Sequence, residues 1–96
     1  MFVSICISTF KRPEGLRTLI EHLQLLQFPK SPALPRIEIV VADNEALPST
    51  RSLVEELAAN SIYPIVYVPE PRRGISFARN ASVAGASSQC QVMAFI

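Results

Sequence analysis

The 96 residues are enough for one small domain, and nearly half of them are hydrophobic, which allows a buried core. The formal net charge of +1 argues against a nucleic-acid-binding surface, so no nucleic-acid partner is expected. Cys6, Cys90 and the lone His22 lack the spacing of a zinc site, and both cysteines are expected to be free thiols. The apolar residues 1–10 are too short to span a bilayer and lack the features of a signal peptide, so a cytoplasmic location is expected.

The first part of the chain predicts a strand followed by a helix. In residues 2–8, β-branched residues alternate with small side chains, which favours a buried strand. Pro13 suits the first turn of a helix. The apolar residues that follow recur at spacings of three and four and form one helical stripe: Leu16, Leu19, Ile20, Leu23 and Leu26.

A proline-rich connection over residues 28–35 leads to a second strand and a second helix. Residues 37–42, IEIVVA, predict another buried strand. Pro48 and Ser49 open the helix. Its expected inner stripe is Leu53, Val54, Leu57 and Ala58.

The remaining residues predict a strand, a helix and the beginning of a fourth strand. Residues 62–68 form the third strand, and Pro64 either places it at a sheet edge or delays its start. A helix is expected over residues 75–86, with Ser76 as its N-cap. Residues 91–96, QVMAFI, predict the fourth strand. The small residues expected to let the helix pack closely on the sheet are Ala78, Ala81 and Ala84.

Strands therefore alternate with helices along the chain. This order predicts an α/β fold with an open, mostly parallel, Rossmann-like sheet of about four strands and helices on both faces. Ligands of such sheets bind at the carboxyl ends of the strands, so the loops after the first three strands are the candidate site. The chain lacks GxGxxG, GxxxxGK[ST] and GxSxG motifs, which argues against a usual dinucleotide-binding fold, a P-loop NTPase and an α/β-hydrolase.

Chemically useful side chains follow the first and second strands. In the loop STFKRP, Phe10 can stack on a flat base, and Ser8 and Thr9 can meet phosphate oxygens near a helix start. A structural interpretation stays open, in which a hydroxyl caps the helix and the ring covers the end of the sheet. Asp43 can accept a hydrogen bond from a base or a sugar hydroxyl, or it can cap the next helix.

The third loop, EPRRGIS, places Arg72 and Arg73 just before a helix N-terminus. Cations are unfavourable beside the positive end of the helix dipole, and a bound diphosphate would offset their charge. A solvated basic turn is the alternative. Arg79 lies one turn into the same helix.

Taken together, VSICISTFKRP, IEIVVADN, and RRGISFARNASVAGA followed by VMAFI resemble family 2 glycosyltransferases of the GT-A fold, over essentially the whole chain. VADNEALPSTRSLVEEL and GISFARN are similar to the succinoglycan-biosynthesis glucosyltransferases, which build bacterial exopolysaccharide. The resemblance implies that residues 1–96 are the nucleotide-sugar-binding half of a GT-A domain. It also implies an inverting hexosyltransferase, with a nucleoside diphosphate sugar, in particular a UDP-sugar, as donor and a saccharide or lipid-linked hydroxyl as acceptor.

The resemblance further implies roles for individual residues. Phe10 belongs to the segment that cradles the uracil ring, and Asp43 matches the acid that contacts the base. Asn80, in the same ARN motif as Arg79, is expected to support the helix. Ala42 stands where many family members carry another acid, which leaves the choice among nucleotide donors open. The implied nucleotide-binding residues are Ser8, Thr9, Phe10, Arg12, Asp43, Gly74 and Arg79.

In this family the fourth strand leads into a short acidic motif that ligates Mg²⁺ or Mn²⁺ at the diphosphate. The sequence stops at Ile96, where those acids would begin, and the half that would supply a general base is not within it. A divalent metal is therefore expected for a full-length parent. No bound metal, no catalytic residue and no activity are expected of these 96 residues alone.

Other functions stay open. A stand-alone nucleotide-binding or interaction module would account for the lack of a catalytic pair. A nucleotidyltransferase is disfavoured because STFKRP lacks the glycines of its first loop. We also expect self-association through the apolar fourth strand, and a parent enzyme that works at the inner face of the membrane.

Overall fold

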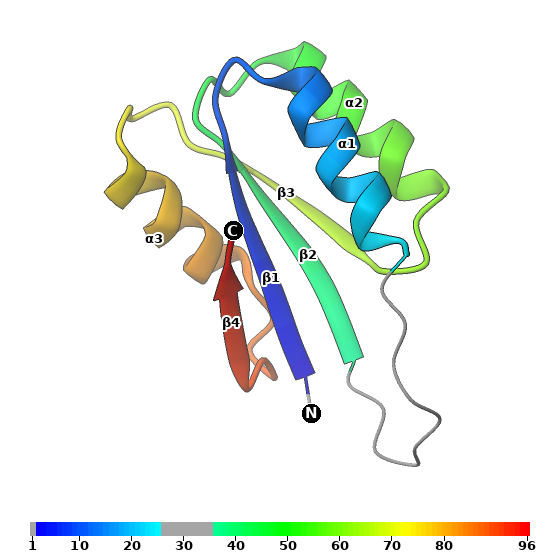
Figure 1. Cartoon of the computed structure of the whole chain (residues 1–96). Coiled ribbons are helices and arrows are strands. Elements are labelled where there is room, and N and C mark those ends of the chain that lie inside the picture. Colours follow the sequence, from blue (N-terminus) through cyan, green and yellow to red (C-terminus); the bar gives the residue numbers. More distant parts are fainter. Residues whose placement is uncertain (1, 26–35) are drawn as a thin grey trace.

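The computed structural model describes residues 2–25 and 36–96, in which strands and helices alternate as the sequence predicts (Figure 1). Leu26 and the connection over residues 28–35 lie outside the described residues. None of the described helices is long and apolar enough to cross a bilayer. The elements are β1 (Phe2–Thr9), α1 (Pro13–Leu23), β2 (Arg36–Asp43), α2 (Pro48–Ala59), β3 (Ile65–Pro69), α3 (Ile75–Gly85) and β4 (Val92–Phe95).

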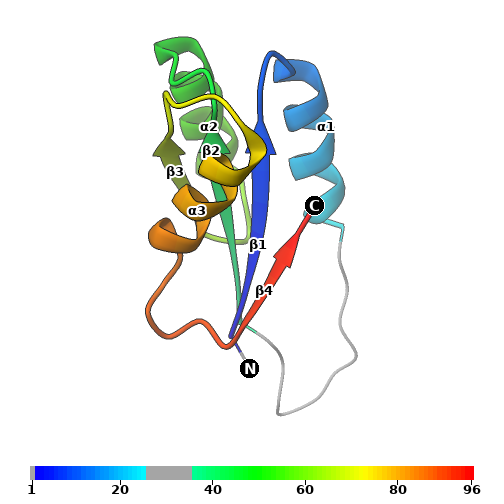
Figure 2. The same cartoon turned by 90° about the vertical axis from the view of Figure 1, so that its left-hand side faces the viewer.

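The strands form one sheet in the order β3-β2-β1-β4, and every neighbouring pair is parallel. Helices α1 and α2 cover one face of the sheet and α3 covers the other (Figure 1, Figure 2). This arrangement confirms the predicted α/β class with helices on both faces. Because the strands run in one direction, the loops after β1, β2 and β3 lie at the same end of the sheet (Figure 1).

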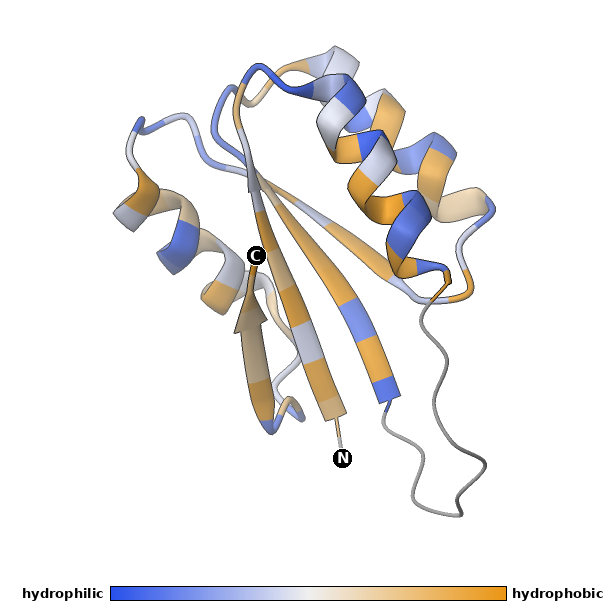
Figure 3. Cartoon of the chain, in the orientation of Figure 1, coloured by the Kyte–Doolittle hydropathy of each residue, from blue (hydrophilic) through white to orange (hydrophobic). Residues whose placement is uncertain are grey.

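Side chains on one face of β1 and β2 pack against α1 and α2 to form the core. Ile39 and Val41 at the centre of the sheet are 0% exposed. Figure 3 shows the strands as the most hydrophobic part of the chain, with the apolar stripes of both helices beside them. The predicted stripes of the two helices are confirmed where they are buried, at Leu16, Ile20, Leu23, Val54 and Leu57.

Smaller residues on the opposite face let α3 lie close to the sheet. Ala78 and Ser82 are each 1% exposed, and a Cβ added to Gly85 would overlap Val68 Cγ2. The prediction that Ala84 faces the sheet is wrong, because Ala84 is exposed. A helix has about 3.6 residues per turn, so a strict spacing of three drifts away from the sheet within two turns.

The start of β3 and the N-cap of α3 differ most from the prediction, whereas the other predicted strand ends and the end of α3 differ by at most one residue. β3 begins at Ile65 rather than at residue 62, and it lies at the edge of the sheet, so Pro64 both delays the strand and precedes an edge strand. The N-cap of α3 is Gly74 rather than Ser76, and no side chain caps this helix. The first N–H groups of α3 therefore have no side-chain acceptor in the cap.

Candidate functional site

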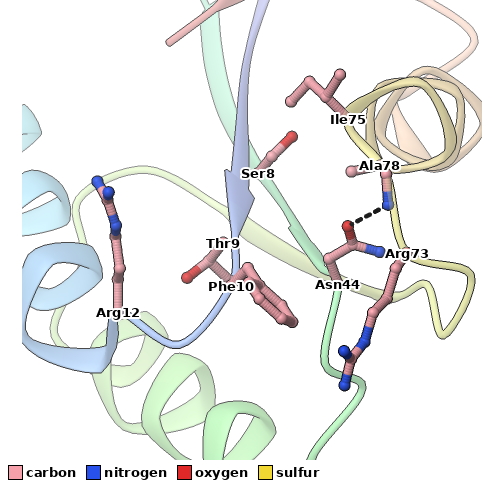
Figure 4. A pocket seen from close by; sticks show the side chains of 9 residues that line it. Ser8, Thr9, Phe10, Arg12, Asn44, Arg73, Ile75 and Ala78 are labelled. Carbon is pink, nitrogen blue, oxygen red and sulfur yellow. Dashed lines mark hydrogen bonds between the residues drawn. The ribbon is translucent and has the colours of Figure 1, made fainter.

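A pocket of about 490 Å³ lies where the carboxyl ends of β1 and β2 meet the start of α3 (Figure 4). Three loops that are far apart in sequence form its wall, as expected for a parallel sheet. Residues of the predicted site that line the pocket are Ser8, Thr9, Phe10, Arg12 and Gly74. Asn44, Arg73, Ile75 and Ala78 complete the lining.

An aromatic ring and two cationic side chains lie together in the lining of the pocket. Phe10 is 38% exposed, and the Arg73 guanidinium lies 5.2 Å from the centroid of its ring. Figure 4 shows Arg12 on one side of Phe10, and Asn44 and Arg73 on the other. Within residues 2–25 and 36–96, neither Arg12 nor Arg73 forms an ion pair. The pocket therefore carries positive charge that forms no ion pair with an acid in the described part of the chain.

Hydrogen bonds fix the first loop against the second. Lys11 has a φ of 53°, which is uncommon for a residue other than glycine. Its main-chain N–H donates to Glu45 Oε1 at 2.7 Å, and its ammonium lies 5.3 Å from the Phe10 ring centroid. The Asn44 N–H donates to the Thr9 carbonyl at 2.9 Å. These contacts hold Phe10 at the end of β1.

The carboxylate of Asp43 is buried and already hydrogen-bonded. Oδ1 accepts from the Glu45 N–H at 3.0 Å, and Oδ2 accepts from the Leu47 N–H at 3.1 Å and from the Tyr67 hydroxyl at 2.6 Å. Burial is the main cause that raises the pKa of Tyr67, and the hydrogen bond to Asp43 raises it further. The Tyr67 hydroxyl is therefore a stable hydrogen-bond donor to the Asp43 carboxylate. Asp43 thus organises the turn into α2 and does not line the pocket. Its contact with a base stays a prediction.

The two arginines of the third loop make different contacts. Arg72 Nη2 lies 2.6 Å from Glu70 Oε1, and its guanidinium lies 4.6 Å from the Phe77 ring centroid. The hydrogen bonds from Arg72 hold the pKa of Glu70 below its ordinary value. Arg72 is therefore paired and does not line the pocket, whereas Arg73 does.

Gly74 joins this loop to α3 with a φ of 134°, a conformation that favours glycine. Its carbonyl accepts the N–H of Ala78 at 3.1 Å and so begins the helix. The N–H groups of the first helical turn have no acceptor within the helix, and they suit an anion. Gly74 and Ile75 both line the pocket, so the start of α3 faces it.

Arg79 lies beside the pocket rather than in it. It lines an adjoining pocket of about 220 Å³, and its guanidinium lies 5.8 Å from the Phe95 ring centroid. Ser8 and Ile75 line both pockets, so Arg79 borders the main one. Its predicted contact with a nucleotide stays a prediction.

The profile of glycosyl transferase family 2 matches residues 4–96. The chain belongs to this family. It is 40% identical over 80 residues to the succinoglycan biosynthesis protein ExoM of Rhizobium meliloti (strain 1021), and the alignment covers 83% of this chain and 25% of that protein. The chain therefore spans about a quarter of the length of this curated relative. No solved structure matches the chain. The resemblance read from the sequence is confirmed.

Of the four lining residues that the sequence did not predict as nucleotide-binding, two carry polar side chains, Asn44 and Arg73. Asn44 follows Asp43 directly, and strand alternation turns it toward the α3 face, a signal that was present in the sequence. The sequence places Arg72 and Arg73 side by side before the helix and does not distinguish them. The two arginines differ because Arg72 contacts Glu70 and Phe77, whereas Arg73 lines the pocket. The sequence pattern alone does not reveal this difference.

The family implies a divalent metal, and the described part of the glycosyltransferase chain does not fit one. It contains no group of three His, Cys, Asp or Glu residues that could hold a metal ion. The acids of the loops are engaged elsewhere: Asp43 with main-chain N–H groups, Glu45 with Lys11, and Glu70 with Arg72. We therefore assign no step to a metal at these residues.

Proposed function

We propose that the pocket binds the nucleotide of a nucleoside diphosphate sugar, in particular a UDP-sugar, and that the whole protein is an inverting hexosyltransferase. The observation that carries this proposal is the exposed Phe10 ring facing the Arg73 guanidinium, 5.2 Å away, at the pocket. An aromatic face stacks on a base, and a guanidinium can stack on a base or bind phosphate. Phe10 and Arg73 together therefore offer a stacking surface for a base and a cation for a phosphate in the same pocket.

The diphosphate is proposed to lie between Arg12, Arg73 and the first turn of α3. Both arginines line the pocket without forming an ion pair in the part of the chain that the structure describes. The helix dipole adds positive potential at Ile75. A bound anion would neutralise this charge, whereas an uncharged ligand would leave it uncompensated.

In the proposed reaction the acceptor hydroxyl attacks the anomeric carbon of the donor sugar. The bond from that carbon to the diphosphate breaks, and the nucleoside diphosphate leaves with the electron pair. A general base takes the hydroxyl proton, and a single displacement inverts the anomeric configuration. The residues of this pocket orient the donor and stabilise charge on the leaving group. The base and the divalent metal of the whole protein remain predictions.

The biological setting is proposed from the relative, whose name places it in succinoglycan biosynthesis. We propose that the whole protein acts in bacterial polysaccharide biosynthesis, with a saccharide or lipid-linked acceptor. We further propose that the protein is cytoplasmic and that a lipid-linked acceptor would bring it to the inner face of the membrane.

UDP is expected to bind the 96-residue chain weakly, and the chain alone is expected to transfer no sugar. In an NMR titration, UDP should shift the amide signals of Phe10, Arg73 and Gly74, and uridine should bind more weakly because it lacks phosphates. ADP serves as the control for the base. Shifts that avoid the pocket, or equal binding of uridine and UDP, would contradict the proposal. Micromolar UDP affinity without metal would contradict the expected weakness.

We also propose that the chain self-associates through β4. This strand pairs with β1 on one side, and no other described strand pairs with it. Val92 is 43% exposed, and edge strands with apolar side chains pair readily with a second copy. Light scattering should show a mass that rises with concentration, and Val92→Lys should reduce it. Val83→Lys on α3, at a residue that is 45% exposed, is the matched control and should change nothing.

A further inference from the structure

Among the described residues, the side chain of Asn44 makes hydrogen bonds only to the main chain of the loop between β3 and α3. Nδ2 donates to the carbonyls of Glu70 at 2.9 Å and Arg72 at 2.7 Å. Oδ1 accepts the N–H of Gly74 at 3.1 Å, the bond that is dashed in Figure 4. Asn44 is 9% exposed. Both amide hydrogens are therefore used, and the carbonyl oxygen is engaged as well.

These bonds bracket Arg73. The carbonyl of Arg72 and the N–H of Gly74 belong to the two peptide groups that flank the Arg73 Cα, and Asn44 holds both. The direction in which the Arg73 side chain leaves the main chain is then fixed. That side chain lies over the Phe10 ring. The main-chain N–H of Asn44 is itself bonded to the Thr9 carbonyl, next to Phe10.

We propose that Asn44 is the positioning residue of the donor site: it holds the loop over residues 70–74 so that the Arg73 guanidinium lies over the Phe10 ring at the pocket. The part of this inference that concerns donor binding rests on the proposed function. The positioning itself rests only on the hydrogen bonds and the burial. Asn44 thus acts on the ligand through Arg73.

The chemistry of the contacts requires an amide at this position. Aspartate has the same shape, but its carboxylate would face the carbonyls of Glu70 and Arg72 with no hydrogen to donate. Asn44→Asp is therefore expected to release the loop while changing little in volume. Asn60→Asp makes the same chemical change at an exposed residue beyond the end of α2 and serves as the matched control.

The first test needs no ligand. Amide hydrogen exchange, followed by NMR, should show the Gly74 N–H protected in the wild-type chain and exchanging about tenfold faster or more in Asn44→Asp, as the loss of about 1.4 kcal/mol would give. Exchange at Ile20 in α1 should stay slow in both variants, which shows that the fold is intact. Unchanged protection at Gly74 would overturn the proposal, and so would equal acceleration by Asn60→Asp.

The second test asks whether Asn44 acts through Arg73. Arg73→Gln should weaken UDP binding in the wild-type background, and it should have a much smaller effect in the Asn44→Asp background. Additive effects would show that Asn44 does not act through Arg73, and the proposal would fail. A wild-type chain that does not bind UDP would contradict the proposed function and the donor part of this inference, while Gly74 exchange still decides the positioning.

Discussion

Replacing Phe10 with alanine is expected to weaken UDP binding about tenfold or more, since stacking of a base on an aromatic ring contributes about 1–3 kcal/mol. Phe10 lines the pocket and lies outside the buried core, so the folded chain should persist without the ring. An NMR titration with UDP measures the dissociation constant, and thermal unfolding of the same variant checks the fold.

Phe77→Ala is the matched control for this change. Phe77 is 39% exposed against 38% for Phe10, and each ring has an arginine guanidinium over it. Phe77 does not line the pocket, so its loss should leave UDP binding unchanged. An equal loss of affinity in both variants would mean that Phe10 does not stack on the base.

Replacing Gly85 with alanine is expected to lower the free energy of unfolding by about 1–3 kcal/mol, the usual cost of overpacking a tight contact. The added Cβ would overlap Val68 Cγ2, and it would also lie 3.6 Å from Val40 Cγ1. A valine side chain is stiff, so α3 would have to move away from β2 and β3. Urea unfolding followed by circular dichroism measures the change.

Gly15→Ala should have the opposite effect. Gly15 lies in α1, and an added Cβ would meet only Arg12 Cβ, at an ordinary distance of 3.7 Å. Alanine in a helix is favoured over glycine by about 0.5–1 kcal/mol, so this variant should be slightly more stable than the wild-type chain. A stabilising Gly85→Ala would show that α3 packs less closely on the sheet.

Most of the fold could be predicted because local patterns carry it. Alternating β-branched residues, helical stripes and the prolines at helix starts each act over a few residues, and they placed every strand and helix in order. The errors arose where the structure depends on helix phase or on the cap. Ala84 was expected to face the sheet because it follows Ala78 and Ala81 at a spacing of three, but it is exposed. Ser76 was expected to be the N-cap of α3, but the N-cap is Gly74.

The site was predictable to the level of its loops but not of its contacts. Asp43 and Asn44 are adjacent polar residues at the end of one strand, and alternation sends them to opposite faces. Asp43 then meets the turn into α2, which follows it directly, and Tyr67, which is 24 residues away in sequence. The acid is the more obvious candidate from sequence, because a carboxylate can accept a hydrogen bond from a base. The amide of Asn44 instead meets the loop over residues 70–74.

The position of β1 has a consequence for how the chain folds. β1 comes first in the sequence yet lies inside the sheet, with Val3 paired to Ile37 on one side and to Val92 on the other. Pairing between such distant segments closes large loops and slows folding. During synthesis β1 can pair first with β2, while its other side stays open until residue 92 has emerged. We therefore expect the nascent chain to need protection of that open strand until β4 has been synthesised and can pair with it.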